Sequence, residues 1–117
     1  MTVRAVVMAD ADGVIRGWST GAAELFGHTP DQAIGEKLDL IVPADYRARH
    51  WHGFNAAVAS GKNEPGNVGN VPILRRDGSH GRLAVHLVVL TDAFGAGAGA
   101  VAVFAPLPAD GGGLYQL

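Results

Sequence analysis

The sequence predicts an α+β fold: one five-stranded antiparallel sheet with helices on one face. Two apolar, β-branched segments come first, segments with helical periodicity follow, and three further strand-like segments close the chain. The last three strand segments are joined by short turns, which requires antiparallel pairing. The 117 residues, 48% of them hydrophobic, can bury one core. We expect a single domain over residues 1–105, followed by a flexible tail or linker over residues 106–117.

The first two strands are predicted to form a hairpin. Residues 3–8 are apolar and rich in valine, and residues 14–18 return as a second strand. Between them lies Asp10-Ala-Asp12-Gly13, in which the glycine can adopt a positive φ.

Three helical segments are predicted in the middle of the chain. Ser19 or Thr20 can cap the first, which stops at Gly27. Thr29-Pro30 opens a short second helix, because proline is tolerated in the first turn, and Gly35 ends it. The third and longest begins at Pro43-Ala-Asp45 and ends at Ser60-Gly61.

The last third of the chain is predicted to be β-structure. Residues 63–70 are polar and glycine-rich, which is typical of a loop or an irregular strand start. Strands are then expected over residues 71–74, 82–90 and 100–104, with turns at Asp77-Gly78 and Asp92-Ala-Phe94-Gly95.

Composition excludes several functions. Nine basic and eleven acidic residues give a formal charge of −2 without a Lys/Arg cluster, so no nucleic-acid partner is expected. A leader and an apolar run of membrane length are both missing, so we expect a cytoplasmic domain without a membrane partner. The sequence has no nucleophile motif such as Gly-x-Ser-x-Gly, and no enzyme activity is expected.

One face of the long helix carries the most informative residue, His50. At helical spacing this face also holds Tyr46, Gly53, Phe54, Ala57 and Val58. An imidazole on an apolar face, with a glycine one turn away, could coordinate a ligand held in the core. The alternative is a core histidine satisfied by a backbone carbonyl. His52, two residues further on, points away from His50 and cannot bind the same ion.

Several motifs in sequence order resemble the PAS domain family from about Val6 to Phe104. They are Asp10-Ala-Asp12-Gly13-Val-Ile-Arg-Gly-Trp18, Ala22-Ala23-Glu24-Leu25-Phe26-Gly27, Gly35, Pro43-Ala-Asp45, Arg75-Arg76-Asp77-Gly78-Ser79 and Asp92-Ala-Phe94-Gly95. The resemblance implies a PAS fold and a sensory module for signal transduction. Thr20 departs from the asparagine usual in the family, and Ala105-Pro106 replaces the common Asp-Ile-Thr-like linker.

The motif Pro43-x-x-Tyr46-Arg47-x-Arg49-His50 looks like the haem-ligating helix of the FixL-type oxygen-sensor kinases. This likeness implies a haem b for gas or redox sensing, with His50 as the metal ligand. It also places Val85 and Leu87 on the gas-binding side. The arginine that this subfamily carries there falls near Gly69, so a bound gas would lack that donor.

Arg-x-Arg-His also occurs in PAS domains with no known haem. The alternative is therefore a cofactor-free signalling or dimerisation module that binds an apolar metabolite or a protein partner. A flavin adduct is not expected, because the chain has no cysteine.

In either case we expect the ligand pocket between the long helix and the sheet. Strand alternation and helical spacing give its predicted lining. These residues are Tyr46, His50, Gly53, Phe54, Val71, Ile73, Val85, Leu87, Val101 and Val103.

The opposite, outer face of the sheet is also predicted to be apolar. It would expose Ala84, Val88 and Leu90, with Ala100 and Ala102 on the next strand. We therefore expect a homodimer through this face, the alternative being that residues 106–117 fold back over it. His86, on the same strand, is expected to be partly buried.

Overall fold

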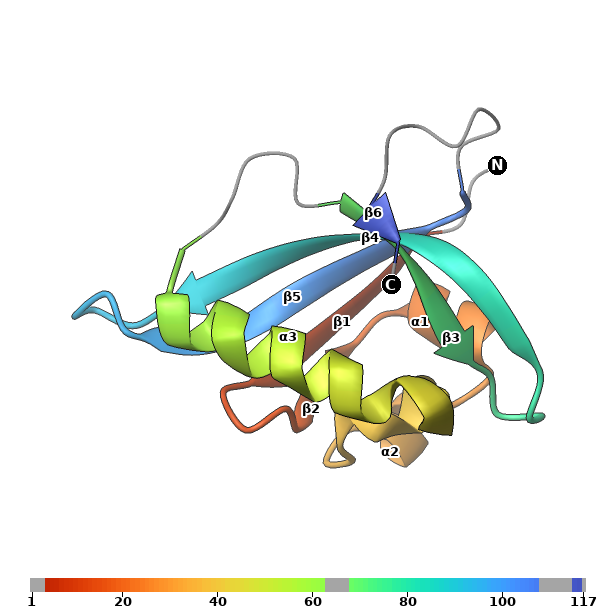
Figure 1. Cartoon of the computed structure of the whole chain (residues 1–117). Coiled ribbons are helices and arrows are strands. Elements are labelled where there is room, and N and C mark those ends of the chain that lie inside the picture. Colours follow the sequence, from red (N-terminus) through yellow and green to blue (C-terminus); the bar gives the residue numbers. More distant parts are fainter. Residues whose placement is uncertain (1–3, 63–67, 108–114, 117) are drawn as a thin grey trace.

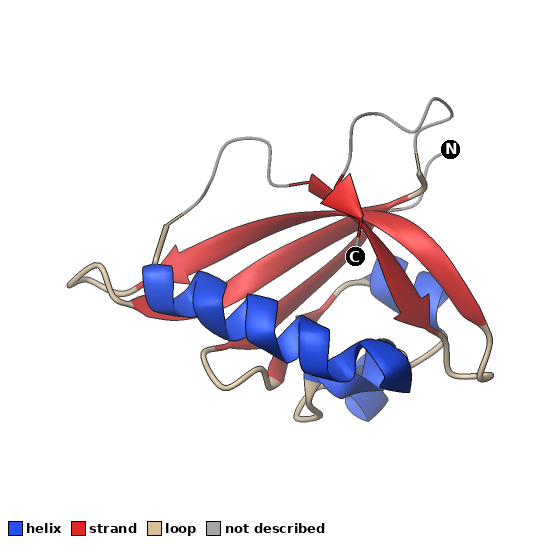
Figure 2. Cartoon of the chain, viewed as in Figure 1, coloured by secondary structure: helices blue, strands red, loops and turns tan. Residues whose placement is uncertain are grey.

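A sheet of five antiparallel strands is the main element of the fold (Figure 1). The computed structural model describes residues 4–62, 68–107 and 115–116. The five strands are β1 (Ala5–Asp10), β2 (Ile15–Trp18), β3 (Val68–Leu74), β4 (His80–Thr91) and β5 (Gly97–Ala105). The sheet runs β2-β1-β5-β4-β3 and is extended by β6 (Tyr115–Gln116), which pairs with β3 in parallel. The helices lie on one face of this sheet (Figure 2). The predicted fold is thus confirmed, with a sixth short strand that was not predicted.

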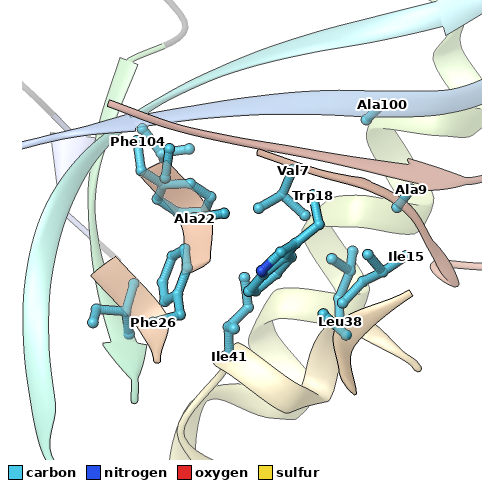
Figure 3. Packing of buried hydrophobic residues seen from close by; sticks show 14 of the residues in the cluster. Val7, Ala9, Ile15, Trp18, Ala22, Phe26, Leu38, Ile41, Ala100 and Phe104 are labelled. Carbon is cyan, nitrogen blue, oxygen red and sulfur yellow. The ribbon is translucent and has the colours of Figure 1, made fainter. Parts of the chain in front are cut away.

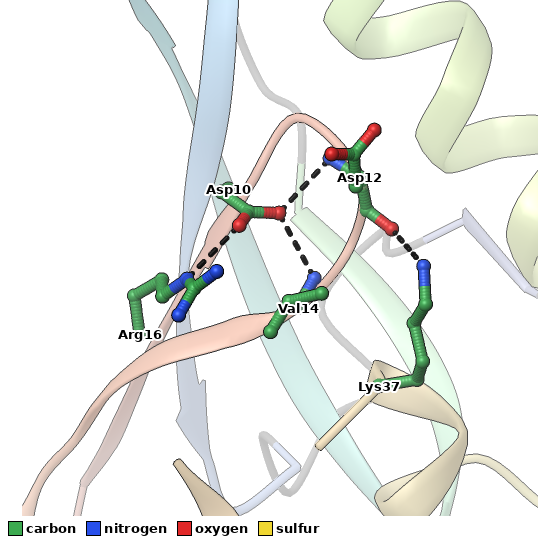
Figure 4. A network of polar contacts seen from close by, with 5 residues as sticks. All are labelled: Asp10, Asp12, Val14, Arg16 and Lys37. Carbon is green, nitrogen blue, oxygen red and sulfur yellow. Dashed lines mark hydrogen bonds and ion pairs between the residues drawn. The ribbon is translucent and has the colours of Figure 1, made fainter. Parts of the chain in front are cut away.

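The β1–β2 turn is organised by one carboxylate (Figure 4). Asp10 Oδ1 accepts hydrogen bonds from the backbone N–H groups of Asp12 and Val14, at 3.0 and 3.1 Å, while its Oδ2 accepts one of 2.9 Å from Arg16 Nε. The hydrogen bond from the Val14 N–H, followed by that from Arg16, lowers the pKa of Asp10. Gly13 takes a φ of +78°, as its place in the turn predicted.

The first helix begins at Ser19, one of its two predicted caps, and the second begins at the predicted Thr29-Pro30. In α1 (Thr20–Phe26), Ser19 Oγ accepts from the N–H of Ala22 at 3.1 Å, and Gly27 ends the helix with a φ of +87°. In α2 (Pro30–Ala33), Thr29 and Gln32 form a reciprocal capping box.

Two 3₁₀ turns, η1 (Leu38–Ile41) and η2 (Ala44–Tyr46), lead into α3 (Arg47–Ser60). The region predicted to open the long helix, at Pro43–Asp45, is thus a 3₁₀ turn, and Gly61 ends α3 as expected. Among the described residues, no helix is long and apolar enough to cross a membrane.

The strands are longer than predicted wherever a partner strand extends them. β3 already begins at Val68, because Gly69 and Asn70 pair with Val85 and Ala84 of β4. The propensities of Gly69 and Asn70 are poor for a strand, and the ladder overrides them. The predicted strand start at residue 3, the loop over 63–67 and the tail over 108–114 lie outside the described residues.

The core lies between the sheet and the helices, and aromatic side chains fill one end of it (Figure 3). The Phe26 ring lies 5.6 Å from the Trp18 ring and 5.2 Å from the Phe104 ring, measured between centroids. Phe26 is fully buried. Trp18 Nε1 donates to the His28 carbonyl at 2.9 Å, so the largest side chain of this cluster has its polar atom satisfied.

The predicted orientation of β5 is wrong. Ala102 pairs with Val7 and Leu87, which face the core, whereas Val101 pairs with Met8 on the outer face. Because side chains alternate along a strand, Ala100 and Phe104 point inward with Ala102, and Val103 points outward with Val101. At the start of β5 the helix α3 approaches closely, since a Cβ added to Gly97 would clash with the carbonyl oxygen of Val58.

His86 also differs from its prediction. It lies on the outer face of β4, pairs with Val103 and is exposed. At His86 the outer face of the sheet is therefore more exposed to solvent than we predicted.

Candidate functional site

A cavity of about 290 Å³ lies between α3, η1 and the inner face of the sheet. The part of its wall that described residues form is apolar except for two neighbouring residues of α3, Arg49 and His50. The lining residues are Val7, Ala9, Leu38, Ile41, Val42, Arg49, His50, Gly53, Phe54, Ala57, Val71, Pro72, Ile73, Val85, Leu87, Ala100, Ala102 and Phe104.

Most of the predicted lining residues are brought together. The wall contains the predicted residues His50, Gly53, Phe54, Val71, Ile73, Val85 and Leu87. Tyr46 lies outside the lining. Ala100, Ala102 and Phe104 take the place of Val101 and Val103 in the lining, because each side chain of β5 points to the face opposite the one predicted.

Sequence reasoning missed Arg49 and the contribution of β1. Residues four apart on a helix are neighbours, so the pair Arg49 and Gly53 could have indicated that the arginine borders the cavity. The alternation of β1 could likewise have placed Val7 and Ala9 inside. No sequence pattern could have placed the η1 residues in the cavity wall, because their position depends on how a 3₁₀ turn packs against the sheet.

The His50 imidazole lies in the wall with an unpartnered nitrogen. Its Nδ1 is buried, and no atom of the described residues forms a hydrogen bond with it. The alternative of a histidine satisfied by a backbone carbonyl is therefore unsupported at Nδ1. The ring stacks on Phe54, with centroids 6.0 Å apart and planes inclined by 26°, and meets the edge of Trp51 at 5.0 Å. These two aromatic contacts orient the imidazole.

Burial lowers the pKa of His50 from its ordinary value of 6.5, although the charge of Asp39 acts in the opposite direction. His50 is therefore neutral at pH 7. A neutral imidazole nitrogen can accept a hydrogen bond or bind a metal ion.

The margin of the cavity holds an exposed glycine, Gly53, and a cation, Arg49. A Cβ added to Gly53 would meet no atom within 4 Å. Arg49 is exposed and also lines the cavity, so it lies where the cavity meets solvent. The guanidinium carbon of Arg49 lies 5.7 Å from the centre of the Tyr46 ring, which gives Tyr46 a contact with the site's margin.

His52 is exposed and lies outside the cavity wall, as its spacing predicted. No cluster of three metal-ligating side chains occurs within the part of the chain that the structure describes. Among the described residues, His50 is the one lining residue whose side chain commonly ligates metals.

The fold and the sequence together define a sensory domain of the PAS class. Residues 3–106 match the family described as "PAS fold". The chain belongs to the PAS family, whose domains are generally sensory modules.

Two curated relatives are similar to parts of the chain. An uncharacterised protein of Azorhizobium caulinodans is 38% identical over 80 residues, which is 67% of this chain and 11% of that protein. The sensor protein FixL of Bradyrhizobium diazoefficiens is 37% identical over 46 residues, 39% of this chain and 9% of FixL. The matched segments therefore span about a tenth of either relative.

A solved PAS domain of a protein from Colwellia psychrerythraea has the same fold. It superposes with a TM-score of 0.75 at 23% identity, over 87% of this chain and 84% of that one.

Proposed function

We propose that this PAS domain senses a small ligand or cofactor in the cavity between α3 and the sheet, and that the cofactor is haem b. The observation that carries the proposal is the neutral, half-buried His50, whose Nδ1 has no partner in an otherwise apolar wall. Leaving a buried polar atom without a partner costs about 1–3 kcal/mol, and a ligand that engages it recovers that cost.

The donor set fits a haem with one protein ligand, and the cavity of about 290 Å³ would have to enlarge to hold the macrocycle. A neutral imidazole is a common axial ligand of haem iron, and an apolar pocket controls access to the metal. His50 would ligate the iron, Phe54 would fix the plane of the imidazole, and Val85 and Leu87 would supply part of the apolar wall. When bound, the haem would supply an iron centre whose electronic state responds to gas ligands or to redox potential.

A second candidate is favoured by the size of the cavity. Its 290 Å³ lies at the lower end of the range of small-molecule sites, about 300–1,000 Å³. A small apolar metabolite would occupy this volume without enlargement of the site. In that case the domain would be a cofactor-free signalling module, and His50 would accept a hydrogen bond from the ligand.

Absorption spectroscopy separates the two candidates. The purified chain is reconstituted with haem, desalted and examined for the intense haem band at the violet edge of the visible spectrum. Haem retention by the wild type, its loss in His50→Ala and its persistence in His52→Ala would support haem ligation. Equal haem content in wild type and His50→Ala would overturn the assignment of His50, and no retention by the wild type would favour the second candidate.

The outer sheet face supports self-association as part of the proposed function. Val6 and Met8 on β1 are 39% and 37% exposed. The partly exposed Val103 and Val101 of β5 pair with them, and the partly exposed Val88 of β4 pairs with Val101. Adjacent exposed aliphatics on a sheet form an apolar patch that a second copy can cover. The patch differs from the predicted one, since the valines of β5 replace Ala100 and Ala102, and Ala84 is buried.

A further inference from the structure

We infer that the ligand of the cavity carries a carboxylate and that Arg49 is the residue that binds it. The inference rests on the proposed use of the cavity as a ligand site. It extends that proposal by naming the chemical class of the ligand: an apolar body with an acidic group at one end.

The distribution of charge around the cavity is the first argument. Arg49 and His50 are adjacent in sequence, and among the described residues they are the only lining residues with polar side chains and none of the lining is acidic. Among the described residues, the structure gives Arg49 no carboxylate partner. A guanidinium can bind a carboxylate with two parallel hydrogen bonds, and such charge-assisted bonds are stronger than neutral ones.

The position of Arg49 on α3 is the second argument. It lies in the first turn of a 14-residue helix that has no acidic residue in that turn and no side-chain cap. The N-terminal end of a helix carries a partial positive charge, which adds to that of the guanidinium. The Tyr46 ring, 5.7 Å from the guanidinium carbon, favours a defined arrangement of this long side chain.

The one acidic residue that influences His50 does not compete for this position. Asp39 Oδ1 accepts a hydrogen bond of 2.7 Å from Trp51 Nε1, and Asp39 lies outside the cavity lining. Arg49 is therefore available to an anion from outside the chain. A ligand carboxylate bound to Arg49 would place the remainder of the ligand beside Gly53.

The cavity volume sets the size of the ligand body. A cavity of about 290 Å³ lies at the lower end of the range of small-molecule sites, so it takes a compact ligand body. Octanoate is a suitable probe of this size, and octanol is its uncharged counterpart. The same carboxylate chemistry could also come from the propionate groups of a haem, and protohaem and its dimethyl ester form the corresponding pair of probes.

The test measures the affinity of all four probes for the full chain and for three variants. Arg49→Gln removes the cation, and Arg49→Lys keeps the charge without the planar guanidinium. Lys62→Gln, just beyond the C-terminal end of α3, is the control for net charge. We expect the wild type and Lys62→Gln to bind at least one acid about tenfold or more tightly than its uncharged counterpart. Arg49→Gln should abolish this preference, and Arg49→Lys should keep part of it.

Each outcome decides between the possibilities. A preference confined to octanoate identifies a free acid as the ligand class, and one confined to protohaem identifies the propionates as the source. Equal affinity within both pairs, or a preference that survives Arg49→Gln, overturns the role of Arg49 while the cavity remains a ligand site. Binding of none of the four probes contradicts both the inference and the proposed function.

Discussion

Trp51 donates a 2.7 Å hydrogen bond from its indole Nε1 to the Asp39 carboxylate, and this bond joins α3 to η1 directly beside His50. The same indole packs on the β1–β2 turn so closely that any Cβ at Gly13 would clash with it. Lys37 Nζ lies 5.7 Å from the centre of the indole ring. Trp51 therefore fixes the helix that carries His50 and Arg49 against two other elements.

We expect Trp51→Phe to lower the free energy of unfolding by about 1–3 kcal/mol, because it leaves the partly buried Asp39 without its donor. Urea denaturation measures this change. Asp39→Asn keeps an oxygen acceptor and should cost less. A Trp51→Phe variant as stable as the wild type would show that the hydrogen bond makes no net contribution.

Filling the cavity should reduce ligand binding more than it reduces stability. Leu87 is partly buried and lines the cavity, so the larger side chain of Leu87→Trp can extend into existing space. Val89 lies on the same face of β4, is 4% exposed and does not line the cavity. Val89→Trp is the matched control, and overpacking should lower its free energy of unfolding by about 1–3 kcal/mol. If both variants lost a similar free energy of unfolding and Leu87→Trp kept its ligand affinity, a usable cavity at Leu87 would be excluded.

Stability should fall as the pH is lowered through the ordinary pKa of histidine. Burial lowers the pKa of His50 below 6.5, and burial followed by the charge of Arg76 lowers that of His28. The unfolded chain therefore binds protons at a higher pH than the folded chain. The free energy of unfolding decreases as the pH falls through 6.5 and levels off below the folded pKa values.

Urea denaturation at about pH 7.5 and about pH 5 measures this dependence. We expect His50→Gln to lose less stability than the wild type between the two values, and the double variant with His28→Gln to lose least. An unchanged pH dependence in His50→Gln would contradict the assignment of a neutral buried imidazole.

Charging the outer sheet face should prevent self-association. Val88 and Val101 pair with each other in the β4–β5 ladder, so Val88→Lys and Val101→Lys place a charge at the same position on the patch. We expect both variants to be monomeric by light scattering at concentrations where the wild type is a dimer. Ile34→Lys, which charges a 46% exposed isoleucine outside the sheet, should still dimerise. A wild type that stays monomeric at high concentration would remove the interface.

Much of the fold could be predicted because its signals are local. Ser19 and Thr29 as helix caps, Gly27 and Gly61 as helix ends, and the Asp10–Gly13 turn all depend on residues close together in sequence. Helical spacing was likewise sufficient to place His50, Gly53 and Phe54 on one wall of a cavity.

The sequence alone determined the order of elements, the membership of the PAS family and the helix face that borders the cavity, because periodicity and turn chemistry are properties of short segments. The tertiary structure decided which face of β5 points inward, where β3 begins and that Arg49 lies at the margin of the cavity. Alternating small and large apolar residues on β5 suit either face of a sheet, and its register with β1 and β4 turns the alanines inward. The unpartnered Nδ1 of His50 also depends on tertiary structure, because a hydrogen bond is made or missed according to atoms distant in sequence.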